Sequence, residues 1–449
     1  MRPSRLALSL TISLSLCACE KSRGEEAPRP APHRESPPAV DNGGAMAPVT
    51  GDTATDRAIR DAQTAARNAP GRGRPLLRLA QLFVRKARES SDPGFYQQAD
   101  DAVTRALRID PNDLAALQIR GVVLMQDHRF REARELAARA IARDPEQAIF
   151  HGLLGDAEME VGNYQAAESA YQRMIDLRPN LASYSRGSWM RWLLGDVDGA
   201  IELGRHAVEA GSPRVPEEMA WTIVQLGNLY LAKGDLDEAQ RNFEAALRVF
   251  PGYPTALDAR GQVKRLRGDL AGAIADATAA VEGATTTEHL IHLGEAQEAA
   301  SHTADAAATY AQAERAGRRS DPRSLALFYA NHDRDHEAAV SLARREVASR
   351  AEDVYAQDVL AWALYRAGHL EEAAQLCDRA RRLGTREARF SYHAGKIALA
   401  LGHREEAATL LREALRMNER FDVRGADDAR SVIATLDREG VRELRVADR

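Results

Sequence analysis

Cysteine, lysine and aromatic residues are scarce in this chain of 449 residues. Three residues are cysteine, aromatic residues make up 5%, and only five of the 61 basic residues are lysine. Alanine, leucine and arginine dominate instead, a bias typical of chains made mostly of helix. With 44% hydrophobic and 28% charged residues, the chain can bury a core, in one large or several small folded units. The composition favours an all-α protein.

Several signatures of function are also missing. The 61 basic and 66 acidic residues are mixed along the chain and give a net charge of −5, so no basic patch points to nucleic acid. The sequence contains no glycine-rich phosphate loop, no G-x-S-x-G motif and no H-E-x-x-H motif. We therefore expect no catalytic residues, no metal and no cofactor.

The amino terminus has the features of an export signal. Two arginines precede an apolar run at residues 6–16. The run is too short to cross a hydrocarbon core of about 30 Å as a helix that rises about 1.5 Å per residue. This pattern predicts a signal peptide over residues 1–18.

Two of the three cysteines lie at the end of this leader. The sequence Leu16-Cys17-Ala18-Cys19 resembles the lipobox of bacterial lipoproteins, in which an aliphatic residue at −3 and a small residue at −1 precede a cysteine. The resemblance implies cleavage before Cys19 and acylation of Cys19, which would leave Cys377 as the sole thiol. A plain cleaved signal peptide is one alternative. A metal or redox site is another, but it needs more ligands than two cysteines one residue apart.

A proline-rich segment follows the lipobox. Residues 19–51 carry six prolines among glycine, serine and charged residues, and cannot bury enough apolar surface to offset the entropy of ordering. We expect a disordered tether that spans on the order of 30 to 90 Å. Glu20 follows the anchor, which by resemblance to lipoprotein sorting in Gram-negative bacteria implies the outer membrane, where acyl chains would hold the protein facing the periplasm.

An internal period organises the rest of the chain. Pro111, Pro145 and Pro179 are 34 residues apart, and a helix of small residues precedes each of them. A period of this length indicates a solenoid. Ten alanines recur at intervals of 32 to 39 residues: Ala99, Ala133, Ala167, Ala200, Ala239, Ala273, Ala306, Ala338, Ala373 and Ala407.

The repeating pattern resembles the tetratricopeptide repeat, whose signature is W-x₂-L-G-x₂-Y, then A-x₃-F, then P. The fifth copy fits best and lacks only the tryptophan: Ile223, Leu226, Gly227, Tyr230, Ala239, Phe243 and Pro251. The resemblance implies a right-handed superhelical α-solenoid of about ten helix-turn-helix repeats. Glycines twelve residues before the marker alanines are expected to let the two helices of a repeat approach closely. The pairs must stack, because neither helix can bury its apolar face alone.

The expected domain organisation follows the repeats: a capping helix in residues 52–75, repeats one to four in 76–213, repeats five to ten in 217–420, and a second capping helix with a tail in 421–449. Four or five extra residues lie within 210–219, between the fourth and fifth copies. Because they include Pro213 and Pro216, we expect a lengthened loop or a bend between two arrays.

We number each repeat from the residue nineteen before its marker alanine. All four tryptophans then fall at position 2, 9 or 12 of a repeat. By resemblance, these positions and position 5 line a concave groove. We call positions 2, 5, 9 and 12 the groove positions. Aromatic residues are enriched in binding hot spots. The sequence predicts two patches that bind a partner, one with Trp189, Trp192, Trp221 and the nearby Asn228, the other with Tyr355, Trp362, Tyr365 and Tyr392. The alternative is that these side chains pack against the next repeat.

The remaining candidate residues are expected to be structural. His332 and His336 have the spacing of a zinc pair, but they flank a predicted turn, so we expect solvated side chains. His289 and His292 are expected to be half-buried. Cys377 takes the aromatic position of the ninth repeat and is expected to be a buried, inert thiol.

These features together predict an outer-membrane lipoprotein whose solenoid binds other proteins. The ligand would be an extended peptide or a partner helix in the groove, and the setting the assembly of a cell-envelope complex, by analogy with the family. The alternative is a module that binds envelope glycan, in which the tryptophans would stack on sugars.

Overall fold

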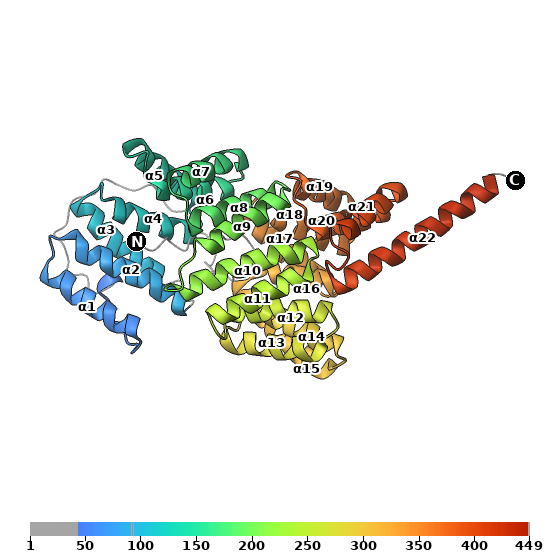
Figure 1. Cartoon of the computed structure of the whole chain (residues 1–449), viewed down its shortest axis with the longest axis horizontal. Helices are drawn as coiled ribbons and strands as arrows, with labels where there is room; N and C mark the ends of the chain where they lie inside the picture. Colours follow the sequence, from blue (N-terminus) through green and yellow to red (C-terminus); the bar gives the residue numbers. More distant parts are fainter. Residues whose placement is uncertain (1–43, 91, 93, 448–449) are drawn as a thin grey trace, which may run out of the picture. The chain divides into compact units, whose positions relative to one another are not determined.

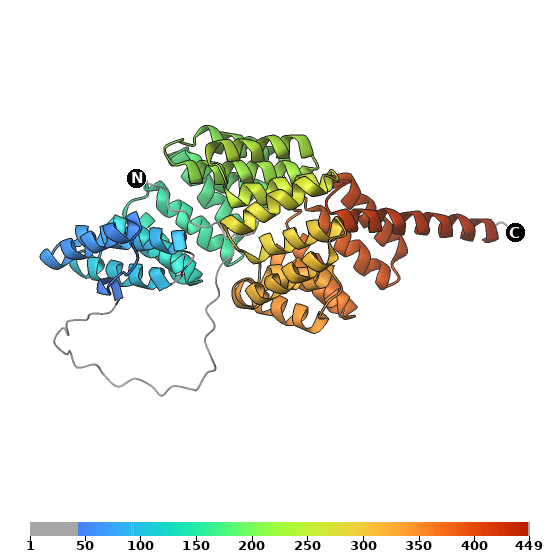
Figure 2. The same ribbon diagram turned by 90° about the horizontal axis from the view of Figure 1, so that it is seen from below.

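The computed structural model describes residues 44–90, 92 and 94–447 (Figures 1 and 2). The predicted leader, Cys19 and most of the predicted tether lie outside this part. The described residues form 22 α-helices and one short 3₁₀-helix, Gly44–Met46, with no strand among them. This confirms the prediction of an all-α fold. The chain divides into two compact units between Glu158 and Met159.

Twenty of the helices follow one another as ten consecutive pairs, and in nine of these pairs the two helices pack against each other. A capping helix α1 (Ala54–Asn68) precedes the pairs and α22 (Val423–Ala447) follows them. The pairs are α2 Gly73–Ser90 with α3 Gly94–Ile109, α4 Leu114–Gln126 with α5 Phe130–Arg143, α6 Ala148–Glu160 with α7 Tyr164–Leu177, α8 Leu181–Leu193 with α9 Val197–Glu209, α10 Pro216–Lys233 with α11 Leu236–Val249, α12 Pro254–Leu266 with α13 Leu270–Gly283, α14 Thr287–Ala299 with α15 Thr303–Ser320, α16 Pro322–Asn331 with α17 His336–Ser349, α18 Val354–Arg366 with α19 Leu370–Arg381, and α20 Ala388–Ala400 with α21 Arg404–Met417.

The turns within the pairs explain why the dipeptide Gly-Asp recurs in the sequence. Gly195, Gly234 and Gly268 have φ angles of +82°, +86° and +82°, in the left-handed region that favours glycine at the end of a helix. The aspartate that follows each of them caps the next helix. Asp235, for example, accepts a hydrogen bond from the backbone N–H of Glu238 at 3.0 Å. Two adjacent residues therefore end one helix and begin the next.

Alanine and glycine allow the two helices of a pair to lie close together. Nine of the ten marker alanines are at most 3% exposed. A Cβ atom added to Gly227 would lie 2.5 Å from the ring of Phe243, and one added to Gly294 would lie 2.3 Å from the ring of Tyr310. No side chain fits at such distances, so glycine is what lets the aromatic ring of the second helix lie against the first. The structure confirms the predicted role of these two glycines.

The remaining marker alanine is Ala338 of the eighth repeat, and its predicted position lies one residue before the buried one. Ala338 is half-buried, whereas Ala339 is fully buried. The turn between α16 and α17 has four residues, 332–335, where the ninth repeat has three, 367–369. The additional turn residue moves the second helix by one position, which a fixed spacing does not anticipate.

The extra residues between α9 and α10 lengthen a helix as well as a loop. Residues 210–215 form the connection, but Pro216 is the first residue of α10, where its missing N–H would have no helical partner in any case. With 18 residues, α10 is five residues longer than α8 or α12, which have 13 each. The two compact units do not divide at this connection, so it is not the boundary between them.

Residues 44–51, which were predicted to belong to the tether, pack on the first unit instead. Ala45 is fully buried, and its N–H donates to a carboxylate oxygen of Asp101 at 2.9 Å. The side-chain amide of Gln63 donates to the Ala45 carbonyl at 3.0 Å. The folded part of the protein therefore begins before the predicted end of the tether.

Replacing Gly227 by valine should destabilise the second unit by about 2 kcal/mol, because the branched side chain and the Phe243 ring cannot occupy the same space without separating α10 from α11. Urea unfolding measures this difference. Gly71→Val is the matched control, since Gly71 is exposed and a Cβ there meets no atom within 4 Å. Equal stability of the two variants would contradict the packing argument.

Candidate functional site

The residues predicted to bind a partner lie on first helices of the second unit, and most of them are buried. Five are at most 9% exposed: Trp189, Trp192, Asn228, Tyr355 and Trp362. Three are half-buried: Trp221, Tyr365 and Tyr392. The two predicted patches are therefore not open aromatic surfaces in this structure. The five buried residues instead pack within the array, which is the alternative that the sequence left open.

Tyr355 brings the two predicted patches together. The indole N–H of Trp192 donates to the hydroxyl of Tyr355 at 2.8 Å in a buried hydrogen bond. The ring of Trp189 stacks on that of Tyr355 with 6.0 Å between centroids. Trp192 and Tyr355 are 163 residues apart in the chain. Helix α8 of the fourth repeat thus meets α18 of the ninth, and the second unit closes on itself.

Backbone groups take part in the same closure. A Cβ atom added to Gly195 would lie 2.4 Å from the carbonyl oxygen of Gly384, so the two chain segments touch directly. Three further hydrogen bonds join early to late repeats of the unit: Thr385 Oγ1 to the Leu193 carbonyl at 2.6 Å beside this contact, and, at other segments, the Tyr164 hydroxyl to the Glu352 carbonyl at 2.6 Å and the Asn418 amide to the Leu231 carbonyl at 2.9 Å. We call these hydrogen bonds, together with Trp189, Trp192 and Tyr355, the closure contacts.

The second predicted patch forms a stack of rings within the array. Trp362 contacts Tyr365 at 4.8 Å and His393 at 4.1 Å between centroids, with interplanar angles of 18° and 10°. Tyr392 lies against Trp362 at 5.7 Å, and its hydroxyl donates to Asp428 of α22 at 3.0 Å. These contacts tie α18 to α20 and α20 to the capping helix, which is a packing role.

A small pocket lies among α8, α9 and α10. Its volume is about 30 Å³, roughly the space of two water molecules. The lining residues are Ser185, Ser188, Trp189, Gly204, Ala207, Trp221, Thr222, Gln225, Leu226 and Leu229. Trp221 and Gln225 are half-buried, and the indole N–H of Trp189 is buried without an acceptor in the described part of the chain. The pocket lies beside three groove positions, those of Ser185, Trp189 and Trp221, and the protein's own side chains do not fill it.

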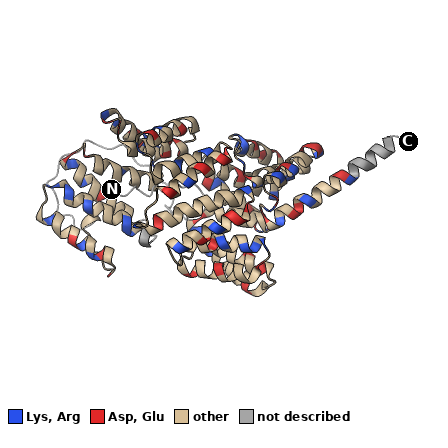
Figure 3. Cartoon of the chain, viewed as in Figure 1, with Lys and Arg blue, Asp and Glu red and all other residues tan. Residues whose placement is uncertain are grey.

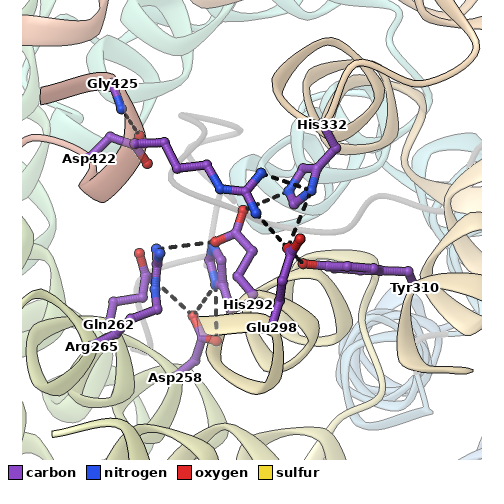
Figure 4. Close-up of polar contacts among 11 residues, drawn as sticks. Asp258, Gln262, Arg265, His292, Glu298, Tyr310, His332, Asp422 and Gly425 are labelled. Carbon is purple, nitrogen blue, oxygen red and sulfur yellow. Dashed lines mark hydrogen bonds and ion pairs between the residues drawn. The ribbon is translucent and has the colours of Figure 1, made fainter. Parts of the chain in front are cut away.

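A network of charged side chains joins α12, α14 and the end of α16 (Figure 4). His292 Nδ1 lies 3.0 and 2.9 Å from the two carboxylate oxygens of Asp258. A guanidinium nitrogen of Arg265 lies 3.1 Å from Glu295, and the other carboxylate oxygen of Glu295 lies 3.3 Å from His332 Nε2. Side chains from three consecutive repeats are thereby linked.

Arg424 of α22 completes this network from the far end of the chain. Its guanidinium lies 2.6 Å from Glu298 and 3.3 Å from His332 Nδ1, and the Tyr310 hydroxyl donates to Glu298 at 2.8 Å. Because a guanidinium can only donate, the contact with His332 fits an imidazole whose proton is on Nε2 and points to Glu295. Arg424 therefore ties the capping helix to the seventh and eighth repeats.

The structure corrects part of the prediction for the histidines. The His332 side chain is 5% exposed, so the prediction that it is solvated is wrong, because α14 and α22 approach the turn from other repeats. His336 is 36% exposed and pairs with Asp333 at 2.8 Å. His289 is buried rather than half-buried. In the described residues no group of three His, Cys, Asp or Glu side chains could hold a metal ion.

The thiol of Cys377 is buried, as predicted. The residue is 2% exposed, and burial raises the pKa of its thiol well above the ordinary value. A protonated and inaccessible thiol is a poor nucleophile. Cys377 therefore packs in the core and does no chemistry there.

Burial and neighbouring charges set the protonation of the network. Burial disfavours the charged form of His292, but the nearby carboxylates, Asp258 first among them, raise its pKa to about 9. Burial raises the pKa of Glu288, an α14 residue that interacts electrostatically with His292 and Asp258, to about 7. Burial also opposes ionisation of Glu295, but Arg265 and the two histidines lower its pKa to about 2. Charges of opposite sign thus compensate one another, as in a structural network.

The network was missed by the sequence analysis, although the sequence carries a signal for part of it. Asp258 and His292 are 34 residues apart, and Asp358 and His393 are 35 apart. The second pair makes the same contact, with His393 Nδ1 3.0 Å from both oxygens of Asp358. The signal for both pairs therefore lies at equivalent positions of adjacent repeats.

Comparison with protein-family profiles agrees with the repeat architecture. Profiles of the tetratricopeptide repeat match residues 120–182, 224–287 and 388–421. Similar solved structures include the MamA protein, which is 19% identical over 36% of this chain and 86% of that chain, with a TM-score of 0.31. The APC/C hetero-tetramer Cut9-Hcn1 is 15% identical over 84% of this chain and 81% of that chain, with a TM-score of 0.38. PilW, a type IV pilus biogenesis factor, is 16% identical over 46% of this chain and 93% of that chain, with a TM-score of 0.40. None of the described helices has the length and apolar character needed to cross a membrane.

His292 should titrate with a pKa of about 9, measured by NMR, and Asp258→Asn should lower it to below about 8, because the main stabilising charge is lost. Since the pKa in the folded state lies above the ordinary value of 6.5, the ion pair contributes its full stabilisation below pH 6.5 for as long as Asp258 stays ionised. That stabilisation is lost as the pH rises to about 9.

The control for this titration is Asp198→Asn, whose carboxylate is 87% exposed and pairs with Lys233. It should leave the pKa of His292 unchanged. An unchanged pKa in the Asp258→Asn protein would show that the ion pair does not control the imidazole.

Proposed function

Since the chain is a tetratricopeptide-repeat protein, we propose that it is a membrane-anchored scaffold that binds protein partners through its groove positions, in the assembly of a cell-envelope complex. Tetratricopeptide-repeat proteins are generally non-catalytic scaffolds, and the superhelix supplies an extended surface for binding. The anchor is proposed from the lipobox-like sequence at Leu16 to Cys19 and from the proline-rich segment after it. Glu20 supports the outer membrane as the location.

The unfilled pocket among α8, α9 and α10 is the observation that supports partner binding most directly. Trp189, Trp221 and Leu226 give it apolar walls. Gln225, which is half-buried at its edge, makes no hydrogen bond with the described part of the chain. An apolar side chain of a peptide or helix would fill the space, and the amide of Gln225 would bind its backbone.

The closure contacts limit where a partner binds. They bury the faces of Trp189 and Trp192 that the prediction assigned to a ligand. A partner would therefore engage Trp221 and Gln225, and not a continuous aromatic groove. Large apolar contacts in a pocket contribute most of the binding free energy in such interfaces.

The alternative function, binding of an envelope glycan, has less support than it had from the sequence. Stacking on sugars needs an exposed face of an aromatic ring. Trp189, Trp192 and Trp362 are at most 7% exposed, and Trp221 is half-buried. Only one tryptophan therefore offers part of its ring to a sugar.

Trp221→Ala should abolish the co-purification of protein partners from detergent-solubilised membranes and leave the melting temperature almost unchanged, because the side chain is only half-buried. Affinity purification with mass spectrometry measures the first effect. Tyr184→Ala is the matched control, since Tyr184 is a half-buried aromatic residue of α8 that does not line the pocket. Retention of the same partners by Trp221→Ala would exclude the pocket. Retention of the wild type by immobilised polysaccharide, with no protein partner, would favour the glycan alternative.

A further inference from the structure

The first unit contains a strongly basic stretch that the charge balance of the whole chain conceals. Between Asp61 and Glu89 the chain has no acidic residue and seven basic ones: Arg67, Arg72, Arg74, Arg78, Arg85, Lys86 and Arg88. They lie at the end of α1, in the turn after it and along α2. In Figure 3 the described part of α2 carries blue and tan positions without red. The net charge of −5 is therefore unevenly distributed.

Four of these arginines have no acidic partner within the described residues, although Arg67 donates a long hydrogen bond of 3.5 Å to the hydroxyl of Thr64. Arg67, Arg72, Arg74 and Arg78 are exposed and form no ion pair within the described residues. Arg74 lies in the first turn of α2, which has no acidic residue, and a positive charge at this end of a helix is unfavourable because of the helix dipole. Helix stability therefore does not explain the arginines.

The end of α3 adds to the same surface. Ala66 of α1, Leu76 of α2 and Ala106 of α3 pack in one cluster, which brings the end of α1, the start of α2 and the end of α3 together. Arg108, two residues after Ala106, is exposed. Ile109 beside it is 43% exposed, and is one of three exposed large hydrophobic residues in the described chain.

The acidic residues near this end leave a positive balance. Asp110 and Asp113 are at the start of the next repeat, where each accepts hydrogen bonds from backbone N–H groups. The two carboxylates offset two of the five arginines at 67, 72, 74, 78 and 108, and a net charge of +3 remains (5 − 2). We call these five arginines, with Ile109, the basic surface.

The chain enters the first unit at this surface. Met46, in the last part of the segment predicted as the tether, packs against the same cluster as Leu77 of α2 and Leu107 of α3. Leu77 is one residue before Arg78, and Leu107 one residue before Arg108. An anchor at the other end of the tether would therefore hold a membrane within reach of these arginines.

We propose that the basic surface docks on the phosphate groups of an anionic phospholipid bilayer and holds the first unit against the membrane. The inference rests on the proposed lipid anchor, which supplies the membrane. Arginine binds phosphate through paired N–H donors, and basic clusters next to a membrane anchor bind anionic lipid in this way. Ile109 supplies an apolar contact at the level of the headgroups.

Vesicle co-flotation of the full-length, unacylated chain tests the proposal. The protein should bind vesicles of equal parts phosphatidylcholine and phosphatidylglycerol in a salt-sensitive manner and prefer them to phosphatidylcholine alone. The triple variant Arg72→Gln/Arg74→Gln/Arg78→Gln should bind the anionic vesicles about 100-fold more weakly, since each arginine near such a surface contributes roughly fivefold.

The matched control is Arg315→Gln/Arg319→Gln/Arg345→Gln, which removes three arginines of the second unit that are exposed and form no ion pair with any described residue. It should bind as the wild type does. The leader is the same in all three proteins and contributes equally. Circular dichroism establishes that each protein is folded.

Equal binding by the two triple variants, or no preference of the wild type for anionic vesicles, would overturn the proposal. So would tighter binding of a DNA duplex or of polyglutamate than of vesicles, with the same dependence on the three arginines, because the surface would then serve another partner. The mass of the mature amino terminus tests acylation of Cys19 separately. Failure of the anchor is thus distinguished from failure of the basic surface.

Discussion

The close approach of paired helices at alanine and glycine is the constraint on which the second unit depends. At Gly227 and Gly294 a Cβ atom would overlap the ring of Phe243 or Tyr310. Glycine at these positions therefore sets the separation of the two helices. Because each repeat then packs on the next with a similar small rotation, the rotations accumulate along the array. After five repeats they bring α18 back to α8, and the closure contacts form.

Closure changes what the groove positions do. Aromatic residues at these positions would face a ligand in an open solenoid. In this protein Trp189, Trp192 and Tyr355 face one another across the array, and Arg424 reaches Glu298 and His332 from the capping helix. The same side chains therefore hold the superhelix together, and a small pocket is left for a partner.

The parts of the structure that depend on neighbours in the sequence were predictable. The ten repeats, the marker alanines other than Ala338, and the role of Gly227 follow from spacing, because they concern contacts within one helix pair. The burial of Trp192 and His332 was not predictable, because it depends on rotations summed over several repeats, which no local pattern encodes. The packing of residues 44–51 was missed since proline and glycine there resemble the tether before them. The anchor at Cys19 stays a prediction.

The distance between the fourth and ninth repeats in solution tests the closure of the second unit most directly. Spin labels at Leu194 and Arg386 suit this measurement, because both residues are exposed and a Cβ at Gly195 would lie 3.7 Å from the Arg386 side chain. With Cys17 and Cys19 replaced by serine, Cys377 is too buried to react. Pulsed dipolar spectroscopy should give a single short and narrow distance distribution, which Trp192→Ala/Tyr355→Ala broadens. A long and broad distribution in the otherwise unchanged protein would show an open solenoid and contradict this account.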